Sequence, residues 1–217
     1  ADGKAHPFIH LMDGGLADNI GARAVQDAYA RGFIRTKLNN REITKLVIIV
    51  VNAATDPQEK LSRRESPPDL PTVAYKTSTV SMDNYSVESI ALITEHLKQR
   101  LQAQKDLEGC RRHLARTCPA APSLPTLGTA LDPYVMEVSF QGAATLDGED
   151  PAYYLNLPTS FRLEAEQVER LVHVGPKLLR ALPQYQCLLA VLEAEAQGAP
   201  RPEACPLGAG IFGPEEE

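Results

Sequence analysis

The chain has 217 residues, of which 43% are hydrophobic, so it is long enough to form one domain with a buried core. Its formal net charge of -6 argues against nucleic-acid binding, which needs concentrated Lys and Arg. No run of 18 apolar residues occurs in the sequence, so we expect no segment that spans a bilayer.

The first element expected is a buried strand at Phe8-Ile9-His10-Leu11-Met12, where an apolar run leads into Asp13-Gly14-Gly15. The two glycines allow the backbone to turn tightly after the strand. Asn19 is placed to cap a helix that continues to about Arg31, with Gly32 as its stop. Because open α/β sheets bind ligands at the carboxyl ends of their strands, Asp13 is the candidate catalytic carboxylate.

The string Asp13-Gly14-Gly15-Leu16-Ala17-Asp18-Asn19-Ile20-Gly21 resembles the Asp-Gly-Gly block of bacterial patatin-like phospholipases. The resemblance implies a Ser-Asp dyad hydrolase of phospholipids or other acyl esters, with no metal and no cofactor. Asp13 would be the general base, and Gly14, Gly15 and Asn19 would form the substrate-site loop. The fold implied is a three-layer α/β/α sandwich with a mostly parallel central sheet. The family resemblance also suggests the bacterial cell envelope or a membrane surface as the location.

The chain lacks the serine partner of that dyad. None of its serines has glycines two residues away on both sides, as a Gly-x-Ser-x-Gly nucleophile elbow requires. We therefore interpret residues 1–197 as the C-terminal part of a patatin-like α/β domain whose nucleophile and oxyanion loop lie in a missing N-terminal segment. The isolated chain is then expected to be inactive, and its exposed sheet edge and apolar face would need covering.

Two further hypotheses remain for the function. The chain could be a non-catalytic α/β partner or scaffold fragment, which the missing nucleophile favours. A flavodoxin-like small-molecule binding domain would share the fold class, but no Gly-x-Gly-x-x-Gly or Walker loop supports it.

Two other titratable residues near Asp13 have simpler interpretations. Asp18 lies at the expected helix start, where a carboxylate commonly stabilises the first turn. His10 lies among apolar strand residues, where a histidine is more often a hydrogen-bonded structural group than a general base.

The next elements are a strand, a long loop and a helix. Residues 46–51 form a continuous β-branched run typical of a strand buried in a parallel sheet, so the first three elements predict a right-handed βαβ unit. The carboxyl end of this strand, residues 52–57, should share a rim with Asp13. Residues 57–85 are rich in Pro, Ser and Thr and are expected to form a long loop or lid. Residues 87–107 predict an amphipathic helix that packs on the sheet.

The C-terminal half begins with an alternating segment at 134–140, which predicts a strand near the sheet edge. Residues 153–161 predict a further short strand. Helical periodicity runs from Val168 to Leu182 through Gly175-Pro176, and Pro183 should open the next helix. Residues 198–217 are expected to be a flexible acidic tail.

The four cysteines, Cys110, Cys118, Cys187 and Cys205, allow three pairings and lack the spacing of a zinc site. Cys110 and Cys118 bracket a short segment and are one candidate pair in an oxidising compartment. The densest basic patch after Arg63-Arg64 is formed by Arg111, Arg112, His113 and Arg116. It is typical of solvated charge or of contacts to anionic lipid head groups.

Overall fold

The computed structural model describes residues 18, 20–40, 42–55, 67, 69–118, 131–158, 160 and 162–212. This part of the chain is a mixture of helix and strand in which helices predominate. The elements in chain order are α2 (Ala22–Ala30), α3 (Phe33–Asn39), β1 (Lys45–Asn52), α4 (Leu70–Thr117), β2 (Asp132–Ser139), the 3₁₀ helix η2 (Phe140–Thr145), α5 (Pro151–Leu155), α6 (Ala165–Ala181), α7 (Pro183–Ala196) and α8 (Ala209–Phe212).

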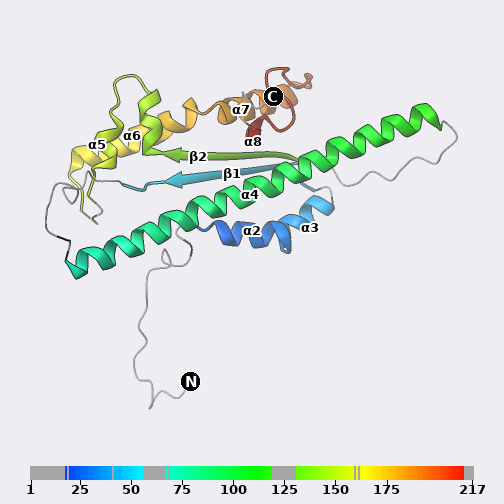
Figure 1. Ribbon diagram of the computed structural model, residues 1–217. Helices are drawn as coiled ribbons and strands as arrows, with labels where there is room; N and C mark the ends of the chain where they lie inside the picture. The colour runs from blue at the N-terminus through cyan, green and yellow to red at the C-terminus, as the bar shows by residue number, and fades with distance from the viewer. Residues whose placement is uncertain are drawn as a thin grey trace, which may run out of the picture.

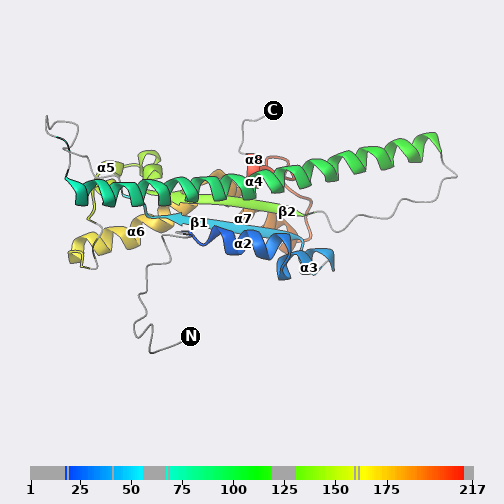
Figure 2. The same ribbon diagram turned by 60° about the horizontal axis from the view of Figure 1, so that its bottom comes forward.

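The two strands form a parallel sheet, with α4 as the connection between them. Their register runs from Lys45 opposite Asp132 to Asn52 opposite Ser139. The predictions of strands at 46–51 and 134–140 are confirmed, and β1, α4 and β2 form a βαβ unit. The predicted βαβ unit that begins with residues 8–12 has its first strand outside the described residues. Helices α2, α3 and α4 lie on one side of the sheet and α6 and α7 on the other (Figures 1 and 2). Within the described residues the sheet has two strands, which is smaller than the central sheet that the patatin-like resemblance implies.

Alternation along the strands distributes side chains between two apolar cores. On the first face, Ile48 of β1 and Val135 of β2 pack with a buried cluster drawn from four segments: Ala22, Leu38, Ile93, Leu97 and Leu131. The predicted amphipathic stripe of residues 87–107 is thereby confirmed, because Ile93, Leu97 and Leu101 are buried.

The second face of β2 is covered by the C-terminal helices. Tyr134 and Met136 pack with Leu188 of α7, and Val138 packs with Val174 and Leu178 of α6. The strand residues are at most 8% exposed. Full burial of these large side chains fastens α6 and α7 to the sheet by apolar contact.

The same face of β1 is not covered. Val47, Ile49 and Val51 lie opposite the buried Tyr134, Met136 and Val138 in the register, yet they are 40%, 43% and 72% exposed. Moreover, β1 has β2 on one side and, among the described strands, no neighbour on the other. An open edge beside an apolar face is the condition expected for part of a larger sheet.

Helix α4 corrects the prediction of a loop or lid over residues 57–85. It begins at Leu70, so residues 70–85 are helical, and much of 56–68 lies outside the described residues. The prolines that suggested a loop precede the helix or fall in its first turn, where a proline costs no intrahelical hydrogen bond.

The predicted strand at 153–161 is also wrong. Residues 151–155 form α5, because Pro151 occupies the first helical position and the Asp150 carboxylate accepts a hydrogen bond from the backbone N–H of Ala152 at 2.9 Å. These start signals outweigh the strand propensity of Tyr153, Tyr154 and Leu155.

The helix predicted to continue to about Arg31 is α2, but it begins at Ala22 with Gly21 in the N-cap position, so the predicted cap at Asn19 is wrong. The Asp18 carboxylate accepts a hydrogen bond from the N–H of Arg23 at 3.0 Å, which confirms that it stabilises the start of α2. Helix α6 continues unbroken through Gly175 and Pro176, and α7 begins at Pro183.

The C-terminal residues up to 212 are packed, so the prediction of a flexible tail from residue 198 is wrong for this stretch. Cys205 is 6% exposed and bonded to Cys187, and Ile211 of α8 packs into the core of the first face. Gly210 lies so close to β2 that a Cβ atom there would be 2.6 Å from the carbonyl oxygen of Pro133. Residues 213–217 lie outside the described part.

The disulfide also corrects the candidate pairing of Cys110 with Cys118, both of which are free and exposed. Cys110 lies in α4 and Cys118 follows its last residue. Eight helical residues rise about 12 Å, whereas disulfide-bonded Cα atoms are about 4.4–6.8 Å apart. A helix through this segment therefore prevents the pairing.

Candidate functional site

The rim at the carboxyl ends of the two strands is held by side-chain hydrogen bonds. The Asn52 amide donates to Glu137 Oε1 at 2.8 Å, and its carbonyl oxygen accepts from the backbone N–H of Ala54 at 3.0 Å. Asn52 is the last residue of β1, so its side chain both ties the two strands together and turns the chain at the rim. This is the edge at which an α/β sheet binds ligands.

The residues predicted to form the catalytic site lie outside the described part of the chain. This holds for Asp13, Gly14, Gly15 and Asn19, and equally for His10. Of the Asp-Gly-Gly block, only Asp18, Ile20 and Gly21 are described, and they precede α2, with Gly21 in its N-cap position. The placement of Asp13 on the rim therefore stays a prediction.

An apolar pocket of about 110 Å³ lies beside β1. Its walls are formed by the start of α2, by α4 and by both strands: Ile20, Ala22, Val25, Ile48, Ile49, Val50, Val51, Ile90, Ile93 and Val135. Four of these residues are consecutive in β1 and point alternately to its two faces, so the pocket reaches the free edge of the strand. Its lining suits an apolar segment and offers nothing to hold a metal or a charged group.

A second cluster joins the chain after β2 to helix α6. The Glu149 carboxylate accepts hydrogen bonds from the Tyr154 hydroxyl at 2.5 Å and from Lys177 at 2.9 Å, and the Arg170 guanidinium lies 3.7 Å away. The hydrogen bond from Tyr154, followed by that from Lys177, holds the pKa of Glu149 below its ordinary value. The Arg170 guanidinium also stacks 3.7 Å from the ring centre of Tyr153.

This cluster lines an open recess of about 310 Å³ together with Glu166, Glu169 and His173. Its cations face carboxylates of the same cluster, so it anchors η2 and α5 to α6 and does not present free positive charge to an anion. The sequence contained no signal for it, because Glu149 and Lys177 are 28 residues apart.

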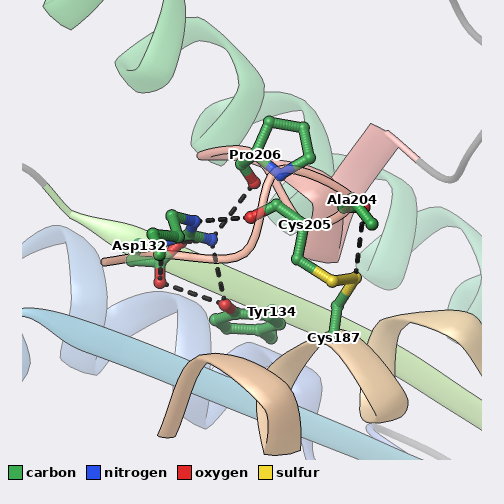
Figure 3. Close-up of a disulfide and its surroundings, with 7 residues drawn as sticks. Asp132, Tyr134, Cys187, Ala204, Cys205 and Pro206 are labelled. Carbon is green, nitrogen blue, oxygen red and sulfur yellow. Dashed lines mark hydrogen bonds and ion pairs between the residues drawn. A yellow bond between two sulfur atoms is a disulfide. The ribbon is translucent and has the colours of Figure 1, made fainter. Parts of the chain in front are cut away.

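A third network lies at the amino ends of the strands, opposite the rim (Figure 3). The Arg201 guanidinium donates to both carboxylate oxygens of Asp132, at 2.9 and 3.2 Å, and to the Tyr134 hydroxyl at 3.2 Å. It also donates to the carbonyl oxygens of Cys205 and Pro206. Burial, and then the charge of Asp132, raise the pKa of Tyr134 to about 12, so the phenol stays neutral.

Other kinds of site find no support in the described residues. No group of three or more His, Cys, Asp or Glu side chains that could hold a metal ion occurs among them. None of the described helices combines the length and the apolar character needed to cross a membrane.

Comparison with known proteins adds no family assignment: no family model matches the chain, and no curated protein or solved structure matches it.

Proposed function

We propose that this chain is the base-carrying C-terminal part of a lipid acyl hydrolase of the patatin-like type, in which Asp13 pairs with a serine from a missing N-terminal segment. The substrate is a phospholipid or another acyl ester, met at a membrane surface of the bacterial cell envelope. The complete catalytic domain would be a three-layer α/β/α fold with a mostly parallel sheet.

The observation that carries the proposal is the incomplete sheet. Val47, Ile49 and Val51 of β1 are exposed on a face whose counterpart on β2 is buried under α6 and α7. Proteins that act alone rarely leave such a patch open beside an unpaired strand edge. The described residues thus have the form of one half of an α/β domain, as expected if another segment completes it.

The parallel pairing supports the position of the base. Strands β1 and β2 end at the same rim, where Asn52 and Ser139 are opposite each other. A further parallel strand at residues 8–12 would end there too, with Asp13 as the residue that follows it. The two glycines after Asp13 would leave space for the acyl group.

The chemistry follows from a dyad without histidine. The serine hydroxyl attacks the acyl carbon while its proton passes to the Asp13 carboxylate, and the protonated Asp13 then gives that proton to the departing alcohol. Water repeats the sequence on the acyl-enzyme and releases the fatty acid. With Asp13 at this rim, the partial positive charge at the N-terminus of α2 would favour its ionised carboxylate.

The test uses the isolated chain and the complete enzyme. The purified chain should not hydrolyse p-nitrophenyl esters until it is supplied with the segment that bears the serine. In the complete enzyme, Asp13→Asn should lower kcat by about 10² to 10⁴, whereas the matched change Asp18→Asn removes only a helix-start contact and should leave kcat within a few-fold. Turnover by the isolated chain, or an active Asp13→Asn enzyme, would contradict the proposal.

The same open face also suits a non-catalytic partner or scaffold that completes its sheet with another chain. The two functions differ in what is encoded upstream of Ala1. A Gly-x-Ser-x-Gly motif and a glycine-rich loop in that reading frame support the hydrolase, and their absence supports the scaffold.

A further inference from the structure

We propose that the free edge of β1 and the pocket beside it hold residues 8–12 of the same chain as a third parallel strand, in the order 8–12, β1, β2. This inference deepens the proposed function, because it decides which edge of the sheet carries Asp13. It depends on that function only for the role of Asp13, and not for the pairing itself.

The first argument is the point at which the described chain begins. Asp18 is fixed at the start of α2, and Ile20, two residues later, is part of the pocket wall. Met12 precedes Asp18 by six residues, which can span up to about 20 Å. The segment therefore joins the described structure at the pocket and needs no long connection to enter it.

The second argument is the handedness of the crossovers. Strand β1 reaches β2 through α4, and residues 8–12 would reach β1 through α2 and α3. Ala22 of α2 and Ile93 of α4 belong to the same buried cluster, so both connections lie on one face of the sheet. Crossovers between parallel strands are right-handed in about 98% of cases. Two right-handed crossovers on the same face step across the sheet in the same direction, which places residues 8–12 on the side of β1 away from β2.

The third argument is chemical fit. The pocket wall is apolar and includes residues from both faces of β1, so it surrounds the strand edge. The segment carries Phe8, Ile9, Leu11 and Met12, with His10 as its polar member. A backbone with such side chains can satisfy the edge N–H and C=O groups while its apolar groups meet the pocket.

The pairing has a consequence for the ligand site. Neighbouring strands lie about 4.8 Å apart, so Asp13 would follow its strand directly beside Asn52 on the rim. Helices of the other half of a doubly wound sheet would cover the opposite face, where Val47, Ile49 and Val51 are exposed.

The test is amide hydrogen exchange, followed residue by residue by NMR on the full chain. In a parallel strand, alternate N–H groups point to opposite neighbours, so every second amide of β1 points away from β2. These outward amides should be protected, and Leu11→Pro should speed their exchange about 100-fold or more while the inward amides keep their rates. Lys4→Pro, outside the segment, is the control. Unprotected outward amides, or rates that Leu11→Pro leaves unchanged, would overturn the pairing.

Cysteine cross-linking gives a second measurement that needs no proline. In a chain with Cys110→Ser and Cys118→Ser, Val50→Cys is combined in turn with Ile9→Cys, His10→Cys and Leu11→Cys. One register should form a disulfide under mild oxidation, because neighbouring strands bring Cα atoms within bonding range. Glu137→Cys is the control, since Glu137 lies opposite Val50 on β2 and hence one strand further away. Cross-linking of none of the three pairs would count against the strand.

These results separate the pairing from the proposed function. Protected edge amides together with a fully active Asp13→Asn enzyme would keep the strand and reject the hydrolase base. Unprotected edge amides together with an inactive Asp13→Asn enzyme would keep the base and reject the strand order.

A different region carries a second inference: the structure assigns the Cys187–Cys205 disulfide as a lock that holds residues 199–212 on the amino end of the sheet, formed in an oxidising compartment. The bond joins α7 to this segment (Figure 3). Arg201 and Gly210 within the segment lie against β2. The two thiols give up two electrons and two protons to a disulfide oxidant of that compartment, which leaves as two thiols.

Thiol counting and thermal unfolding test this lock. Protein exported to a bacterial periplasm should show two thiols when denatured without reductant, Cys110 and Cys118, and four after reduction. Reduction should lower Tm by about 6–12 °C. A Cys110→Ser/Cys118→Ser variant should show the same shift, and a Cys187→Ser/Cys205→Ser variant none. Four thiols before reduction, or a Tm that reduction does not change, would overturn the inference.

Discussion

Replacing Arg201 by methionine should destabilise the protein strongly, because it leaves a buried carboxylate without its cation. Asp132 is 5% exposed, and its two carboxylate oxygens both accept from Arg201. Removing one partner of a buried ion pair costs about 3–5 kcal/mol. The Arg201 side chain is 29% exposed, so water can partly replace it. We therefore expect a loss at the lower end, about 3 kcal/mol.

The assay is urea unfolding followed by circular dichroism, with Arg201→Met, Asp132→Asn and the double variant measured together. In the double variant no charge is left unpaired, so it should be more stable than Arg201→Met by about 1–2 kcal/mol. A loss below about 1 kcal/mol for Arg201→Met, or a double variant no more stable than Arg201→Met, would refute the view that the ion pair compensates a buried charge.

Three further predictions concern packing and acid stability. Gly210→Ala should lower the free energy of unfolding by about 1–3 kcal/mol, because its Cβ would overlap β2. Gly175→Ala in α6 has open space around the added Cβ and should raise the free energy of unfolding by about 0.5–1 kcal/mol. The midpoints of urea unfolding distinguish the two variants. Leu97→Ala removes a side chain that is 1% exposed and should cost about 2–5 kcal/mol, while Leu92→Ala, 45% exposed, should be close to neutral in the same assay. The pKa of Glu149 is lowered in the folded state, so the ionised carboxylate stabilises the fold at neutral pH, and this stabilisation is lost as the pH falls from the ordinary pKa of 4.5 through the lowered value. The Tm of a Glu149→Gln variant should therefore fall less steeply with acid below pH 4.5 than that of the unmodified protein.

The strands were predictable because strand residues that pack in a core recur in the sequence with a recognisable apolar pattern. Residues 46–51 form a β-branched run, and residues 134–140 alternate, and both became strands of one parallel sheet. The amphipathic stripe of Ile93, Leu97 and Leu101 likewise marked the face of α4 that packs. In β2 and α4 the side chains that define the period are the buried ones, whereas in β1 the run was continuous and Val47, Ile49 and Val51 are exposed on one face.

The errors arose where local composition and helix start signals disagreed. Residues 70–85 contain many Ser and Thr residues, which favour loops, but they continue a helix whose later turns are anchored in the core. Tyr153 and Tyr154 favour a strand by propensity, yet Asp150 and Pro151 start a helix ahead of them. Tertiary packing and capping override propensity over such short segments.

The long-range contacts could not be predicted at all. Asp132 and Arg201 are 69 residues apart, and of the three pairings that four cysteines allow, the sequence suggested Cys110 with Cys118 and not the observed pair. Only the docking of α7 on β2 brings Cys187 to Cys205. For the candidate site, a short motif indicated Asp13, while the hydrogen bonds of Asn52 at the rim had no signal beyond the position of that residue at the end of a predicted strand.

Helix α4 continues for several turns beyond the last point at which it packs against the core. Its last buried side chain among those described is Leu101, about four turns before the helix ends at Thr117. Trypsin should cleave after Arg111, Arg112 or Arg116 in this outer part of the helix, where fraying exposes the backbone. A nick there would separate the sequence of β1 from that of β2 without breaking the sheet that joins them. The protein should then survive as two fragments held together by their shared core, and the pair would still elute from a sizing column as one particle.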